Sequence, residues 1–94
     1  MSLIISGQKT VTTAGTEVAL GSQVINCALM VKALPANTGY IYLGKIADGT
    51  VSSSTGLALS AGDVVVFDWV GNLSNIMVDS SVNGEGVSWI MLSV

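Results

Sequence analysis

Short apolar runs rich in β-branched residues follow one another along this chain, and Gly, Asn, Asp or Ser interrupts them about every eight to twelve residues. No segment keeps a helical period, and the Gly, Thr, Val and Ser that fill the chain are poor helix formers. The pattern predicts an all-β fold, an antiparallel β-sandwich or jelly-roll-like barrel of about eight short strands. The 94 residues suffice for one such domain, spanning 1–94.

The expected strands and turns follow from this punctuation. Strands are predicted near residues 3–5, 9–13, 17–20, 24–34, 40–44, 57–60, 64–70, 75–79 and 87–93. Turns are predicted at 14–16, 35–39, 47–49, 61–63, 71–72 and 83–86, where Asp-Gly and Asn-Gly pairs suit a positive φ.

The apolar alternation is clear in one strand and double-sided in another. In 40–43, Ile41 and Leu43 face one side, while Tyr40 and Tyr42 face the other. The strand at 64–70 is apolar on both faces, with one face made by Val65, Phe67 and Trp69 and the other by Val64, Val66, Asp68 and Val70. Such a strand either lies between two packed layers or lies against a neighbouring chain. Because a domain this small has little room for three layers, the neighbouring chain is favoured for at least one of the strands at 40–43, 64–70 and 87–93.

A weak internal repeat relates the two halves of the chain. Six residues recur 47 positions later: Ala14-Gly15, Val18, Met30-Val31 and Gly39 return as Ala61-Gly62, Val65, Met77-Val78 and Gly86. The coincidence arises either by chance, given this composition, or because each half forms a similar set of strands. The second alternative suits a jelly roll built from two Greek keys.

The inventory of reactive side chains is small. The chain has no histidine, one cysteine and nine charged residues, which exclude a Ser-His-Asp triad, a Cys-His pair and the usual zinc sites. Three scattered lysines without an arginine argue against nucleic-acid binding. We therefore expect no enzyme, no catalytic residue, no cofactor and no metal. Cys27 lies in an apolar run and is expected to be a buried, inert thiol.

We expect the chain to carry neither a membrane helix nor an export signal. Its longest apolar runs fall short of the roughly 18 residues of a membrane helix, and its start lacks the basic region of a signal peptide. We expect a soluble chain made in a cytosol, with no membrane partner.

Apolar residues make up 50% of the chain and charged residues only 10%, against about 25% charged in ordinary domains. A chain this short buries only about 60–65% of its extended surface, so an apolar patch should remain exposed and should be covered by oligomerisation. Candidate subunit contacts are Tyr40, Tyr42 and Trp69. Residues 1–7 form a candidate N-terminal arm, whose Leu3, Ile4 and Ile5 would add a strand to a neighbour.

The order of several segments resembles small virion structural proteins of tailed bacteriophages. The segments are 10–16, 32–44, 53–56, 59–63 and 76–87, which together span most of residues 10–92. The resemblance implies β-sandwich subunits displayed on a particle, commonly as trimers, and it carries no functional residues.

The function expected from this resemblance is that of a non-enzymatic head decoration (cement) protein. Such a protein would form a homo-oligomer, a trimer, bind the phage major capsid protein and reside in the virion, assembled in the bacterial host cytoplasm. The alternatives are a tail- or fibre-associated structural subunit, or a module that binds host glycan. A hydrolase is disfavoured because the catalytic inventory is missing.

Overall fold

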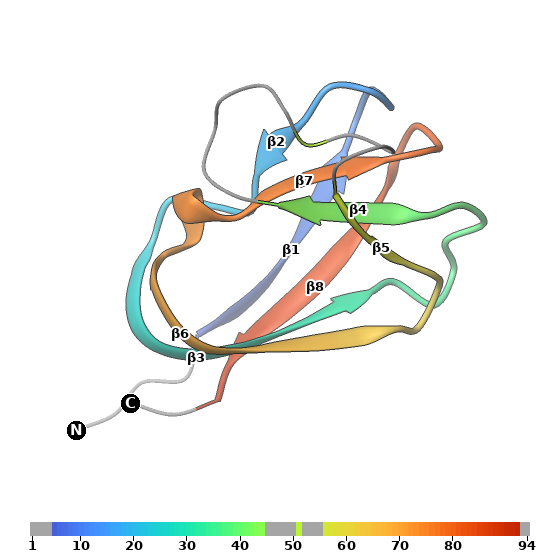
Figure 1. Ribbon diagram of the computed structural model, residues 1–94. Coiled ribbons are helices and arrows are strands. Elements are labelled where there is room, and N and C mark those ends of the chain that lie inside the picture. Colours follow the sequence, from blue (N-terminus) through green and yellow to red (C-terminus); the bar gives the residue numbers. More distant parts are fainter. Residues whose placement is uncertain (1–4, 45–50, 52–55, 93–94) are drawn as a thin grey trace.

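Two antiparallel four-stranded sheets face each other in the computed structural model, which describes residues 5–44, 51 and 56–92 (Figure 1). The first sheet has the strand order β1-β8-β3-β6 and the second the order β2-β7-β4-β5. The strands are β1 (Ser6–Val11), β2 (Val18–Ala19), β3 (Val24–Ala33), β4 (Ile41–Gly44), β5 (Leu57–Leu59), β6 (Val64–Asn72), β7 (Met77–Ser80) and β8 (Glu85–Met91), with a short 3-10 turn η1 (Leu73–Asn75) before β7. The predicted all-β sandwich of about eight strands is confirmed.

The core lies between the two sheets, and the longest strand buries every second side chain. β3 shows this alternation along its whole length, with Ile25, Cys27, Leu29, Val31 and Ala33 buried. Leu29 and Val31 are fully inaccessible, as are Ile41 of β4 and Val78 of β7 in the opposite sheet. The burial of Cys27 agrees with the sequence prediction.

The 47-residue repeat reappears in the topology. A shift of 47 residues relates β1, β2, β3 and β4 to β5, β6, β7 and β8 in turn. If each strand of the first sheet is replaced by its equivalent in the other half, the result is the strand order of the second sheet, read from its other end. Equivalent residues of the repeat also pair in the same register. Val31 pairs with Val65 in the first sheet, and their equivalents 47 positions away, Val78 and Val18, pair with each other in the second. Each half therefore contributes two strands to each sheet, and the two halves interlock.

Glycine turns mark equivalent places in the two halves. Gly15 has a φ of +91° and Gly62 a φ of +83°, and a third turn, at Asn83-Gly84, has a φ of +82° at Gly84. L-residues with a side chain rarely adopt this backbone region, so the glycines allow the chain to reverse here at little steric cost. The turn predicted at 71–72 is wrong, because Gly71 and Asn72 belong to the extended strand β6.

A bulge in β6 corrects the predicted faces of that strand. Cys27 pairs with Val70 and Leu29 pairs with Phe67, so Asp68 and Trp69 together stand opposite a single residue of β3. Beyond the bulge the alternation is reversed: Val70 is buried and Trp69 is exposed. The prediction that Trp69 shares a face with Val65 and Phe67 is therefore wrong, and so is the prediction that Val70 shares a face with Val64 and Val66.

The start of the described chain is part of the first sheet. Ser6 pairs with Ile90 and Gly7 with Trp89 in the β1–β8 ladder, and the Ile5 carbonyl accepts a hydrogen bond from the Met91 amide. A free arm over residues 1–7 is therefore wrong for residues 5–7, because their own protomer holds them. Leu3 and Ile4 lie outside the described residues. Among the described residues, no helix has the length and apolar character needed to cross a membrane.

Candidate protein interface

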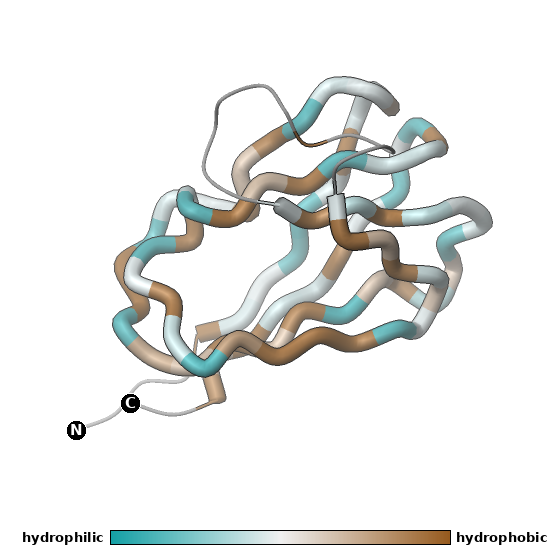
Figure 2. The backbone as a smooth tube through the Cα atoms, in the orientation of Figure 1, coloured by the Kyte–Doolittle hydropathy of each residue, from teal (hydrophilic) through white to brown (hydrophobic). Residues whose placement is uncertain are grey.

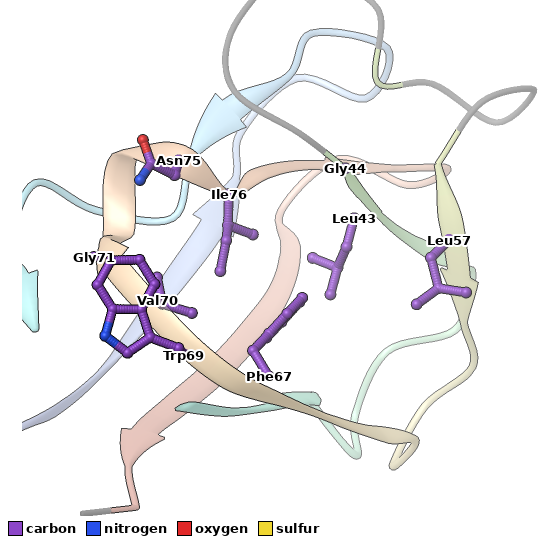
Figure 3. Close-up of a pocket in the computed structure, with 9 residues that line it drawn as sticks. All are labelled: Leu43, Gly44, Leu57, Phe67, Trp69, Val70, Gly71, Asn75 and Ile76. Atoms are coloured by element: carbon purple, nitrogen blue, oxygen red, sulfur yellow. The ribbon is translucent and has the colours of Figure 1, made fainter. Parts of the chain in front are cut away.

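An apolar cavity of about 360 Å³ opens where β6 of the first sheet faces β4 and β5 of the second (Figure 3). Phe67 and Leu43 point toward one another across it, and Leu57 points in from β5. Asn75 is the one polar side chain among the nine lining residues, which are Leu43, Gly44, Leu57, Phe67, Trp69, Val70, Gly71, Asn75 and Ile76. The cavity is thus an unfilled margin of the hydrophobic core along one side of the sandwich.

Large apolar side chains are exposed on the two strands that border this cavity: Trp69 and Leu57 line it, whereas Val64 and Val66 lie on the outer face of β6. Trp69 is 65% exposed, Leu57 53%, Val66 51% and Val64 47%. We call these four residues the apolar strip. Figure 2 shows a hydrophobic stretch along the first part of β6. Residues 64–67 of this strand, before the bulge, are all apolar. Exposed apolar side chains that gather on one side of a small domain mark a contact surface more often than scattered ones do.

The backbone of β6 is also available for contact. Within the described residues β6 pairs on one side only, with β3, and it forms the margin of the first sheet. Its nine residues make a long edge, and such an edge presents a row of amide and carbonyl groups that a further strand can bind. The apolar strip and the open edge therefore lie on the same side of the molecule.

Gly71 positions the Trp69 ring within the strip. A Cβ atom at Gly71 would lie 2.8 Å from Cη2 of Trp69, so the ring covers this glycine closely. Figure 3 shows the ring alongside Gly71 and Val70 at one end of the cavity. The ring is thus held by its own strand while most of its surface faces outward.

The two tyrosines predicted as contact residues have different surroundings. Their ring centroids are 6.4 Å apart, as expected for side chains on one face of a strand. Tyr40 is 51% exposed, whereas Tyr42 is 8% exposed and packs with Val51, Met77 and Ala19 in a small cluster outside the main core. Tyr40 therefore offers surface to a partner, while Tyr42 is mostly covered by its own chain.

Sequence reasoning singled out Trp69 but missed the other members of the apolar strip. Val64, Val66 and Leu57 are exposed in the structure, and none of them was predicted as a contact residue. The signal that pointed to Val64 and Val66 was the double-sided apolar pattern of 64–70; no signal pointed to Leu57. That pattern identified the strand, and it did not say which face would remain open.

The loop at 35–39 is fixed by side chains from the far end of the chain. The Glu85 carboxylate accepts hydrogen bonds from the backbone amides of Thr38 (2.6 Å) and Gly39 (2.9 Å) and from the Thr38 hydroxyl (2.8 Å). These bonds lower the pKa of Glu85, and the bonds from the two backbone amides have the largest effect. Asn37 adds a second clamp, since its amide group donates to the Gly86 carbonyl and accepts from the Gly86 amide. The loop beside Tyr40 therefore has a defined shape.

Other acidic side chains also hold turns. The buried Asp79 carboxylate accepts from the amides of Gly15 (2.9 Å) and Ser80 (2.8 Å), and Asp63 accepts from the amide of Ser60 (2.9 Å). In the described part of the chain no three or more His, Cys, Asp or Glu side chains come together to hold a metal ion. These hydrogen bonds assign Asp63, Asp79 and Glu85 a structural role in the turns.

Comparison with protein-family models, curated proteins and solved structures found no match for this chain. The interpretation of its surface therefore depends on the residues themselves: an exposed apolar strip, an open strand edge and a cavity between them.

Proposed function

We propose that this chain is a non-enzymatic structural subunit of a phage virion, a head decoration protein that associates with its own copies and stabilises the capsid shell. The observation that carries the proposal is the apolar strip along β6 and β5, exposed in a chain with only nine charged residues. Such a surface is costly to leave in water and suits a subunit that functions in an assembly.

A decoration protein stabilises its shell by mass action. It binds the assembled coat lattice and not the free coat subunit, so its binding shifts the equilibrium toward the intact particle. At a free concentration of a hundred times the dissociation constant, each occupied site contributes about 2.7 kcal/mol. Many copies on one lattice add avidity, because neighbouring contacts form without a new loss of translational freedom.

Two parts of the surface suit the two contacts that this function requires. The apolar strip suits copies of the same chain, which meet at a fixed distance on the lattice. The clamped loop at 35–39, with the exposed Tyr40 next to it, suits the coat protein, because a loop held by Glu85 and Asn37 loses little entropy on binding. Tyrosine adds a broad contact surface with a polar end.

The test is where the protein resides and what it does there. Immunogold labelling of particles with an antibody against the purified chain should mark the faceted head. Heads that lack the protein should dissociate at a lower temperature, and adding the purified chain back should restore their stability. Label at the neck or tail, or heads whose melting is unchanged by the added chain, would contradict the proposal.

A glycan-binding module on a tail or fibre is the second candidate, and the exposed Trp69 ring favours it. A flat aromatic ring beside a cavity can stack on a sugar, but the cavity offers Asn75 as its one polar side chain. Glycan-array binding that is lost in Trp69→Ser and kept in Ile90→Ser, a matched exposed apolar position on β8, would favour this alternative over decoration.

A further inference from the structure

We infer that β6 is the contact through which two copies of this chain pair, edge to edge and antiparallel, so that their first sheets join into one continuous sheet across a two-fold axis. The inference deepens the proposed function, on whose self-association it rests, by naming the strand and the symmetry. Two-fold contacts are the commonest in homo-oligomers because one self-complementary surface serves both partners.

The length of β6 is the first argument. At about 3.3 Å per residue, a nine-residue strand presents an edge of about 30 Å. The equivalent strand of the other half, β2, has two residues and so offers almost no edge. Short edge strands are the usual protection against unwanted pairing, and β6 lacks that protection. A long edge kept open in a folded protein is explained by a strand that covers it.

The side chains of β6 provide the second argument. An antiparallel pair related by a two-fold axis keeps the same faces on the same side of the sheet. The outward Val64 and Val66 would therefore lie beside the same residues of the partner, extending one apolar surface. On the inner face, Val65 and Phe67 of the partner would lie across the mouth of the cavity beside Phe67. The contact would thus cover the exposed strand and close the cavity.

Charge and the bulge together select the register. Asp68 is the one charged residue of β6, and a two-fold axis at this position would place two carboxylates opposite each other, which is unfavourable. An axis at Val65 or Val66 keeps the carboxylates apart and uses the regular half of the strand before the bulge. Trp69 would then lie over the partner's turn at 61–63. The geometry therefore favours pairing centred on Val65 or Val66.

The area of the strip can be compared with the area that a stable dimer buries. The strip is about 30 Å long, and its width includes the gap of about 10 Å between two packed sheets. These dimensions give a contact area of several hundred Å² per copy. A standard interface buries about 800 Å² per partner, roughly a sixth of the 5013 Å² accessible surface of this chain. The strip therefore supplies part of a standard interface, and the exposed Trp69 side chain adds to it.

The experiment compares solution masses of the whole chain and two matched variants by sedimentation velocity over a range of concentrations. The wild type should approach twice the 9.6 kDa monomer. Val66→Lys places a charge on the edge strand and should raise the dissociation constant at least tenfold. Ile90→Lys makes the same change on the outer face of β8, which β3 separates from β6, and should leave the mass unchanged. Far-UV circular dichroism confirms that each variant is folded.

Hydrogen exchange of the wild type gives a second readout that needs no variant. Amides of β6 should become more protected as the concentration rises, whereas those of β1, the opposite edge of the same sheet, should not. A monomer at every concentration, a trimer unaffected by Val66→Lys, or concentration-dependent protection elsewhere than β6 would overturn the inference. A monomer that still decorates heads would leave the proposed function standing, and a β6 dimer that binds no particle would overturn only that function.

Discussion

The substitution Gly86→Ala tests whether the close contact between β1 and β8 is a requirement of the fold. Gly86 is buried in β8 and lies opposite Thr10 of β1. A Cβ atom built there would overlap the carbonyl oxygen of Lys9 and would lie 2.9 Å from both the Lys9 carbonyl carbon and the Thr10 Cα. All three atoms are backbone, so no side chain can rotate away, and the strands themselves must separate.

The cost follows from that geometry. Overpacking a well-fitted site costs about 1–3 kcal/mol, and a clash with backbone belongs at the upper end, about 3 kcal/mol. The Gly86 peptide also holds the loop at 35–39, because its carbonyl accepts from Leu34 (3.1 Å) and from Asn37 (2.9 Å). A domain of this length has about 5–14 kcal/mol of stability in total, so the variant should lose a large part of it. The midpoint of thermal unfolding should fall by about 12–24 °C.

Differential scanning calorimetry of Gly86→Ala beside Gly62→Ala measures this effect. Gly62 has a φ of +83°, but beyond its chain neighbours nothing lies within 4 Å of the place that a Cβ atom would take. Alanine there costs only the backbone strain, about 1 kcal/mol or 4–8 °C. Equal losses in the two variants would refute the reasoning, because they would mean that β1 and β8 adapt to a side chain between them without cost.

Two further predictions concern the acids that hold loops. Hydrogen bonds lower the pKa of Glu85, so its ionised form stabilises the fold at pH values above the ordinary pKa of 4.5, and this stabilisation is lost as the pH falls through the lower pKa of the folded state. Thermal melts between about pH 2 and 6 should therefore show a steeper loss of stability in acid for the wild type than for Glu85→Gln. Asp79→Ala leaves the amides of Gly15 and Ser80 without their acceptor and should cost about 1–3 kcal/mol by urea unfolding, whereas Asp79→Asn, which keeps an acceptor oxygen, should cost less.

Local patterns were enough to predict the fold class. Period-two alternation identified β4, and a short apolar run bounded by turn residues identified β3. The predicted turns at 14–16, 61–63 and 83–86 each contain a glycine with a positive φ, which the sequence indicated for Asn83-Gly84. The matching strand orders of the two sheets agree with the second reading of the 47-residue repeat, in which each half forms a similar set of strands. These features are visible in sequence because each depends on neighbours within a few residues or on a simple internal comparison.

The candidate interface was predicted only in part because it depends on register. One extra residue in β6 reverses the side-chain faces beyond Phe67, so Trp69 turns outward and Val70 turns inward. No composition signal marks such a bulge. Likewise, the double-sided apolar pattern of 64–70 fits a central strand as well as an edge strand, and only the pairing shows that β6 lies at the margin. Tyr42 was misleading for a similar reason, because Met77 and Val51 cover it from distant positions.

Comparison of the two halves indicates that the apolar outer face of β6 is not needed for folding. Under the repeat, the inward Val65 and Phe67 correspond to Val18 and Leu20, which pack in the same core. The outward residues diverge: where β6 has Val64 and Val66, the first half has Glu17 and Ala19. The same framework therefore accepts a charged and a small residue at these two positions.

The double variant Val64→Glu/Val66→Ala transfers the outward residues of the first half to β6. Both valines are about half exposed, so the variant should fold with a melting temperature within a few degrees of the wild type, because surface substitutions usually change stability by less than about 0.5 kcal/mol. It should nevertheless sediment as a monomer at concentrations where the wild type is paired. A variant that unfolds would show that these valines serve the domain itself, and one that still associates would show that another surface holds the copies together. Folding and association are expected to separate here because the inner face of β6 serves the core, whereas the outward valines lie beside the edge that pairs with a second copy.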